Sequence, residues 1–205
     1  MGEGERETWT TEEFGPSHAG AVGVLLADGT VPVPVLFLSS SGAECRRVSQ
    51  WSVYDGRSCG GPRAAALRAV CSCGWTGTGR ALDWNQSSEG DGEDPGEAAE
   101  AVADACGRDW DAHTVEVARS ALPLPQTVTA LLEQLEREIE KLAQHSPLAA
   151  VRAARHLEIL AARSAYWPAR DIARDTPPEE AAAALGLNAH DARVHLARFG
   201  DFSRY

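Results

Sequence analysis

Two cysteines, Cys71 and Cys73, are the residues whose type and spacing most clearly indicate chemistry. A structural zinc site needs several Cys or His side chains that converge on one ion, usually four in a tetrahedron. Residues two apart on a strand point to the same side, so both thiols can reach one ion. Gly74 follows them and permits a tight turn at that point. The pair therefore predicts part of a metal site.

The stretch Cys-Ser-Cys-Gly-Trp at 71–75, followed by Trp110 and His113, resembles small zinc-binding modules of high-GC bacteria. In those modules a Cys-x-Cys-Gly-Trp turn precedes a helix that carries Trp-x-x-His. The resemblance covers about residues 67–113. It implies that Cys71, Cys73 and His113 bind zinc. Four protein ligands leave no open position on the ion, so we expect the zinc to be structural.

The fourth ligand is open, and strand pairing favours Cys45. If a hairpin pairs Val53 near Leu67, the strand opposite Cys71 and Cys73 falls around residues 45–49. Cys45 would then face the other two thiols across the hairpin. This preference depends entirely on the register of that hairpin.

Two further cysteines are weaker alternatives. Cys59 would lie at the far end of the hairpin. Cys106 precedes His113 by seven residues, which on a helix is about 10 Å, a long separation for two ligands of one ion. His18 and the other histidines outside the motif show no shared metal spacing. The alternative to zinc is that the cysteines are buried free thiols, since Cys is among the most buried residue types.

A second motif lies near the C-terminus. Residues 179–198 resemble the DNA-binding helices of LuxR-type regulators and of sigma-factor region 4. In those families a small residue in the first helix permits a close crossing, and Gly occupies the turn; here these are Ala182 and Gly186. Asn188 would cap the second helix, which would lie in the major groove. The core positions would be Leu185, Leu187, Val194 and Leu196.

The resemblance also implies which side chains meet DNA. Base edges would be faced by Ala189, His190, Asp191 and Arg193, and phosphates by His195, Arg198 and Arg204. Two positions depart from the pattern: Ala192 stands where the families usually carry Val or Ile, and Asp191 brings negative charge near the groove. The alternative is a helical hairpin with the same packing and no contact with DNA.

The elements that must position these residues indicate an α+β chain. Asp28-Gly29 between β-rich runs predicts a hairpin over 20–38, with Pro32 and Pro34 marking an edge strand. A second hairpin is expected from 48–54 to 67–73. Apolar periodicity and start signals predict helices over 95–120 and 127–144, then one from Ser146-Pro147 to Trp167-Pro168.

The expected organisation has three parts. Residues 1–18 read as a disordered acidic lead, residues 19–120 as a β-rich zinc-knuckle domain with helix 95–120, and residues 121–205 as a helical domain with the helix–turn–helix at 177–199. The two-residue break at Ser146-Pro147 predicts that the helices over 127–167 form an antiparallel α-hairpin. These helices are also a candidate surface for a homodimer or another protein partner.

Charge and composition narrow the function. Residues 1–125 hold 9 basic and 19 acidic side chains, whereas residues 126–205 hold 10 and 11, so a polyanion is tolerated best near the C-terminus. The sequence contains no long apolar run, export signal or catalytic motif. We expect a cytoplasmic, non-enzymatic regulatory protein that associates with double-stranded DNA and carries structural Zn²⁺. The alternative is an adaptor whose acidic N-terminal part docks a partner.

Overall fold

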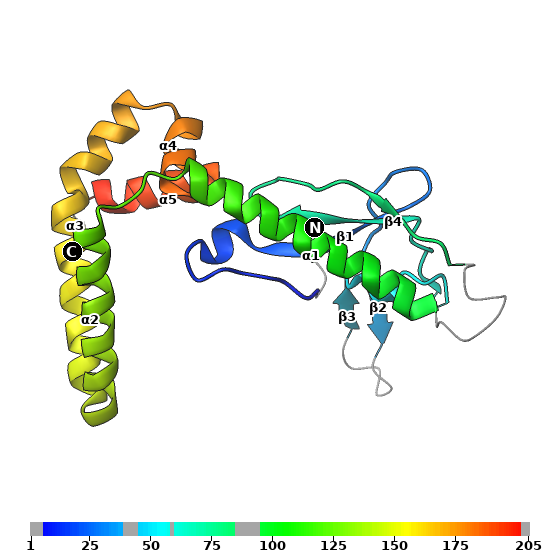
Figure 1. The fold of residues 1–205 in the computed structure, drawn as a ribbon, viewed down its shortest axis with the longest axis horizontal. Coiled ribbons are helices and arrows are strands. Elements are labelled where there is room, and N and C mark those ends of the chain that lie inside the picture. Colours follow the sequence, from blue (N-terminus) through cyan, green and yellow to red (C-terminus); the bar gives the residue numbers. More distant parts are fainter. Residues whose placement is uncertain (1–5, 39–44, 58–59, 85–94, 202–205) are drawn as a thin grey trace. The chain divides into compact units, whose positions relative to one another are not determined.

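The structure is a computed structural model that describes residues 6–38, 45–57, 60–84 and 95–201 (Figure 1). The chain divides into two compact units, residues 1–116 and residues 117–205. The strands lie in the first unit, and the second consists of helices, which confirms the α+β class. Over the described residues, no helix combines the length and the apolar character needed to span a membrane.

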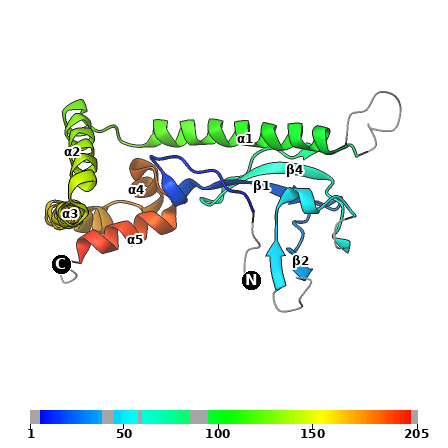
Figure 2. The same ribbon diagram turned by 90° about the horizontal axis from the view of Figure 1, so that it is seen from below.

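The N-terminal unit is built on a three-stranded antiparallel sheet in the order β1-β4-β5. Its strands are β1 (Gly20–Leu25), β4 (Ala66–Cys71) and β5 (Arg80–Ala81). Gly20 pairs with Cys71, so the start of β1 lies beside the end of β4. Two shorter strands, β2 (Val35–Leu38) and β3 (Cys45–Val48), form a separate antiparallel pair. The long helix α1 (Pro95–Ser120) runs along β1 and β4 (Figure 2).

The hairpin predicted over 20–38 is wrong in its pairing, although its turn forms. The Leu26 N–H donates to Thr30 O, and the Gly29 N–H donates to Leu26 O, each at 2.9 Å. Gly29 has the positive φ that the turn requires. The return segment does not pair with β1. Pro32 and Pro34 lack the N–H groups of a strand ladder, and β1 pairs with β4 instead.

The second predicted hairpin is also wrong. Trp51–Val53 forms a short 3₁₀ helix, η2, rather than a strand. The partners of β4 are β1 and β5, while β3 pairs with β2. The register that favoured Cys45 beside Cys71 therefore does not exist in the sheet.

The N-terminal segment differs from the predicted disordered lead over its described residues, 6–18. Trp9 and Gly20 exchange two backbone hydrogen bonds of 2.8 Å, which add a bridge beside β1. The 3₁₀ helix η1 (Gly15–His18) follows, and Phe14 and His18 are buried. The acidic composition of this segment led to the prediction of disorder, but the segment also contains apolar side chains that anchor it.

The core of this unit lies between the sheet and α1. The helix contributes Ala103, Cys106 and Trp110, which pack on apolar residues of the strands and loops: Val22, Val24, Val35, Tyr54, Ala64, Leu67 and Ala69. Trp110 lies so close to Gly20 that a Cβ on Gly20 would sit 2.5 Å from the indole ring. Glycine is therefore required there by the close approach of helix and strand.

The C-terminal unit contains four helices: α2 (Gln126–His145), α3 (Pro147–Asp175), α4 (Pro178–Leu185) and α5 (Ala189–Gly200). The predicted end of the third helix at Trp167-Pro168 is wrong, because α3 continues through Pro168 to Asp175. Proline removes one backbone hydrogen bond from a helix interior. Ala162 and Ala169, which lie on either side of Pro168, are both buried.

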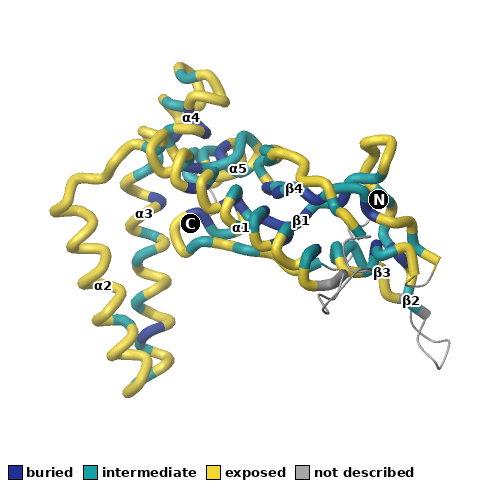
Figure 3. Tube along the Cα trace, turned by 45° about the vertical axis from the view of Figure 1, so that its right-hand side comes forward, coloured by how far each residue is buried: buried dark blue, intermediate teal, exposed yellow. Residues whose placement is uncertain are grey.

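The helices α2 and α3 form the expected hairpin, and much of it is exposed (Figure 3). No residue of α2 is buried, and its apolar stripe is only half covered; Leu131 is 66% exposed. On α3, Leu148 is 85% exposed. A homodimer or partner contact through this hairpin remains a prediction.

The close approach at Gly20 predicts that Gly20→Ala destabilises the protein by about 1–3 kcal/mol, because the added methyl overlaps Trp110. Gly107→Ala is the matched control. A Cβ on Gly107 meets only ordinary contacts with Trp9 at 3.8 Å, and alanine favours a helix, so this variant should be as stable as the parent or slightly more so. Urea unfolding followed by tryptophan fluorescence measures both. Equal stability of the two variants would contradict the packing described here.

Candidate metal centre and candidate nucleic-acid interface

Four metal-ligand side chains converge in the N-terminal unit: His18, Cys71, Cys73 and His113. One ligand atom from each lies within 4.8 Å of the others. Cys71 Sγ is 3.7 Å from His18 Nδ1, and Cys73 Sγ is 3.4 Å from His113 Nε2. In a tetrahedron with ordinary zinc bond lengths, sulfur and nitrogen ligands are about 3.5 Å apart. The group could hold a metal ion with little rearrangement.

A tight turn at the end of β4 places the two thiols. Gly74 N–H donates to Cys71 O, and Cys71 N–H donates to Trp75 O, each at 2.9 Å. Gly74 has φ +94°, which favours glycine at this position. Trp75 N–H also points at Cys73 Sγ, 3.4 Å away. A backbone donor aimed at sulfur stabilises the thiolate form that binds metal.

Ser72, between the two cysteines, fastens this turn to the segment that carries His18. Its backbone N–H donates to Ala19 O at 2.8 Å, and its hydroxyl accepts from Ala19 N–H at 2.9 Å. The same hydroxyl donates to Pro16 O at 2.8 Å. These three bonds fix the residues on both sides of His18 against the cysteine turn. No pattern in the sequence indicated this role for Ser72.

The helix α1 supplies His113 and holds His18 from the other side. Trp110 Nε1–H donates to His18 O at 3.1 Å. The His113 ring stacks on Trp75, with centroids 4.3 Å apart and planes within 4°. Phe14 meets the His18 ring edge-on at 5.5 Å. Aromatic rings thus pack on both histidines of the group.

Burial dominates the electrostatics of the group. It raises the pKa of Cys73 to about 11, opposed by the Trp75 N–H. Burial, and then the neighbouring His18, lower the pKa of His113, which keeps the imidazole neutral as a metal ligand requires. The shift of Cys73 has no contribution from a positive side chain. Reactive cysteines need such a neighbour, so this arrangement favours metal binding over nucleophilic chemistry.

The structure brings together the three ligands implied by the sequence motif, Cys71, Cys73 and His113, and adds His18. Cys45 starts β3 opposite Leu38, outside the sheet that carries Cys71, and its side chain lies outside the described residues, as does Cys59. Cys106 belongs to α1 and is fully buried in the core, and burial raises its pKa to about 11. It is not a member of the group.

His18 was not expected to be a ligand, yet its Nδ1 lies 3.7 Å from Cys71 Sγ. His18 and Cys71 are 53 residues apart in sequence, so no local spacing connects them. They meet because β1, which begins two residues after His18, pairs with the last residue of β4. His18 could therefore be recognised as a candidate ligand only from this strand pairing.

The second candidate site is the pair α4–α5 with its turn. Gly186 takes the left-handed conformation, with φ 63°, and Leu187 N–H returns to Ala182 O at 3.0 Å. Asn188 caps α5 by accepting from Asp191 N–H at 2.9 Å. These features agree with the expected helix–turn–helix, as does the burial of Ala182.

Its packing is made by small residues rather than by the predicted large ones. Ala181, Ala182 and Ala192 are buried. Val194, expected in the core, is 54% exposed, and Leu185 is also exposed. Ala192, the departure from the family pattern, is thus the residue that fits a close crossing of helices.

The residues expected to meet DNA lie on α5, apart from Arg204, which lies outside the described residues. His190, Arg193, His195 and Arg198 are exposed, whereas Ala189 is half-buried. Arg193 Nε donates to Ala189 O at 3.0 Å. Asp191 Oδ2 accepts a hydrogen bond from the side-chain amide of Asn188 at 2.8 Å, which partly compensates the negative charge of Asp191. Desolvation of part of its ring, and then the charge of Arg198, lower the pKa of His195.

No protein-family model, no curated protein and no solved structure matches the chain. The resemblances to zinc-binding modules and to LuxR-type or sigma-factor helices stay predictions from the residues that carry them.

The membership of the group predicts that His18→Ala lowers the metal content of the purified protein from about one ion per chain to a small fraction of that, because a ligand is lost. Cys106→Ala, which removes a buried sulfur outside the group, is the control and should keep its metal. Elemental analysis by inductively coupled plasma mass spectrometry measures both. Full metal content in His18→Ala with loss in Cys106→Ala would show that the fourth ligand is Cys106.

Proposed function

We propose that this is a non-enzymatic, DNA-associated regulatory protein whose N-terminal unit is held together by a structural zinc ion. The observation that carries the proposal is the convergence of two thiols and two imidazoles within 4.8 Å. A tetrahedral set of two sulfur and two nitrogen donors is typical of zinc. Four protein ligands leave no position for a substrate or an attacking water, so the ion would stabilise rather than catalyse.

The place of the ligands in the chain supports a structural role. They come from η1, from the end of β4 with the turn that follows it, and from α1. His18 precedes Cys71 by 53 residues, and Cys73 precedes His113 by 40. One ion would therefore close two long loops and fasten the helix to the sheet. Where a site forms only in the folded state, the free energy of metal binding adds to the free energy of folding.

Removal of the ion provides the test. Treatment with a strong chelator should lower the melting temperature of the N-terminal unit and weaken its near-ultraviolet circular dichroism, since several tryptophans pack around the ligands. The helical signal of α2–α5 should persist, because no ligand lies in those helices. Co²⁺ in place of zinc should give the intense visible bands of a tetrahedral thiolate site. A metal-free protein with unchanged melting would contradict the structural role.

The proposal of DNA contact is supported by the shape and charge of α5. The left-handed turn at Gly186 and the cap at Asn188 separate α4 from α5, as is expected of the two helices of a helix–turn–helix. Its exposed side chains include Arg193 and Arg198, which suit base edges and phosphates. Glu179 and Glu180 in the first turn of α4 limit the number of phosphates that can be neutralised. We therefore expect modest affinity that rests on few basic residues.

The test is fluorescence anisotropy with random duplex DNA at about 50 and 200 mM salt, where phosphate contacts make binding weaken as salt rises. Arg193→Glu should reduce affinity on the order of tenfold without lowering the melting temperature, because the side chain is exposed. Arg57→Glu makes the same charge change on the exposed surface of the other unit and should bind as the parent does. Absence of binding at either salt concentration would leave α4–α5 as scaffold and favour the adaptor.

A further inference from the structure

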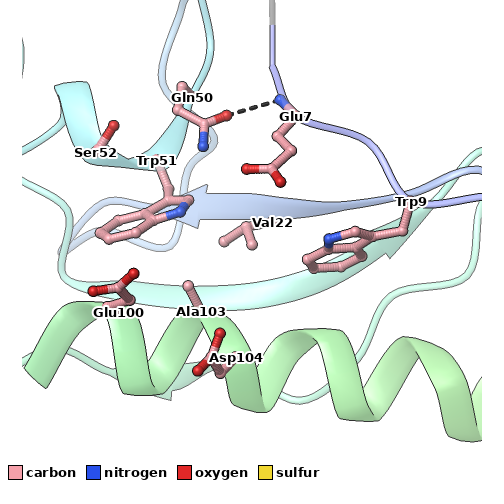
Figure 4. A pocket seen from close by; sticks show the side chains of 9 residues that line it. All are labelled: Glu7, Trp9, Val22, Gln50, Trp51, Ser52, Glu100, Ala103 and Asp104. Carbon is pink, nitrogen blue, oxygen red and sulfur yellow. Dashed lines mark hydrogen bonds between the residues drawn. The ribbon is translucent and has the colours of Figure 1, made fainter. Parts of the chain in front are cut away.

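A pocket of about 330 Å³ lies in the N-terminal unit, away from the four metal ligands. Val22 of β1 and Ala103 of α1, both buried, form its apolar base. The indole rings of Trp9 and Trp51 stand on either side of Val22 (Figure 4). The volume is at the lower end of that of small-molecule sites, so the pocket fits a small ligand or a single side chain.

Both tryptophans are held in place by the fold. Trp9 is bridged to Gly20 by two backbone hydrogen bonds, and its ring packs at 5.8 Å from that of Trp110. Trp51 begins η2 and packs against the core while remaining partly exposed. The two rings therefore line the pocket as fixed walls. A ligand would lose little energy to reorganisation of these side chains.

Three carboxylates surround the same pocket. Glu100 and Asp104 extend from α1 on one side, and Glu7 lies on the other, where its backbone N–H donates to Gln50 Oε1 at 2.8 Å (Figure 4). Within the described part of the chain, none of the three carboxylates forms an ion pair, and no Lys or Arg lines the pocket. The pocket is thus negative and aromatic.

We propose that this pocket binds a weakly hydrated organic cation, either a quaternary ammonium or a guanidinium group. The faces of tryptophan rings attract such cations, and nearby carboxylates add charge attraction. An anion would be repelled by the three carboxylates. A divalent metal ion is disfavoured, because among the described residues these carboxylates do not converge as the His18 and Cys71 group does. The cation could be a free small molecule or an arginine of a partner protein.

The site does not rest on DNA contact, and its test uses the zinc-loaded full chain without nucleic acid. Tetramethylammonium chloride is titrated while the indole N–H signals are followed by ¹H–¹⁵N nuclear magnetic resonance. Saturable shifts are expected for Trp9 and Trp51, with sodium chloride at the same ionic strength giving none. Trp167, which lies in the other unit, provides an internal reference. Absence of saturable shifts with tetramethylammonium and with the arginine probe below would overturn the proposal.

Paired variants test the carboxylates. The double variant Glu100→Gln, Asp104→Asn should weaken binding on the order of tenfold, because two charges beside the rings are lost. Glu97→Gln with Asp111→Asn removes the same charge from exposed positions of the same helix that do not line the pocket, and should bind as the parent does. Equal weakening in both pairs would show general charge attraction and overturn the site.

A second probe identifies the source of the cation. The capped tripeptide Gly-Arg-Gly is titrated beside tetramethylammonium, with capped Gly-Gln-Gly as the neutral control. Tighter binding of the arginine peptide supports a partner side chain as the ligand, whereas tighter binding of tetramethylammonium supports a free small molecule. Equal binding of the glutamine peptide would show that charge is irrelevant and would contradict the proposal.

Discussion

The N-terminal unit depends on the meeting of three segments that are far apart in sequence at His18, Cys71, Cys73 and His113. Ordering long connections into one place costs conformational entropy, and a small sheet with one covering helix buries a limited apolar area against that cost. A metal ion bound at the meeting point would offset it. The bonds of Ser72 to Ala19 and Pro16, and of Trp110 to His18, prepare the same junction through the protein's own groups.

Close approach of helix and strand also sets the geometry of the unit. Gly20 admits the Trp110 ring against β1, and it pairs with both Trp9 and Cys71. One glycine therefore connects the N-terminal segment, the end of β4 and α1. Of these two partners, Cys71 belongs to the metal group and Trp9 lines the aromatic pocket. A change in the packing at Gly20 would therefore alter the geometry of both sites.

The C-terminal unit is built on a different principle. Its close contacts are made by alanines, such as Ala169 of α3, Ala182 of α4 and Ala192 of α5, which let helices approach with little side-chain volume. Larger apolar residues, including Leu131 and Val194, stay exposed. This leaves α5 with an accessible face carrying Arg193 and leaves the α2–α3 hairpin partly uncovered.

The sequence by itself determined the helices, the turn at Gly186 and the thiol pair, because each follows from spacing within a few residues. Periodic leucines predict α2, and Cys71-Ser-Cys73-Gly74 predicts a turn that presents two sulfurs. The partners of the strands could not be read in this way. The turn after β1 suggested a hairpin, but the return segment contains Pro32 and Pro34 and does not pair with β1. The partner of β1 is β4 instead. Whether His18, Cys45 or Cys106 completes the group depends on this long-range pairing, which brings His18 to Cys71 and leaves Cys106 in the core. Local patterns fixed which residues can do chemistry, whereas the tertiary structure decided which of them meet, since strand pairing is set by packing over the whole unit.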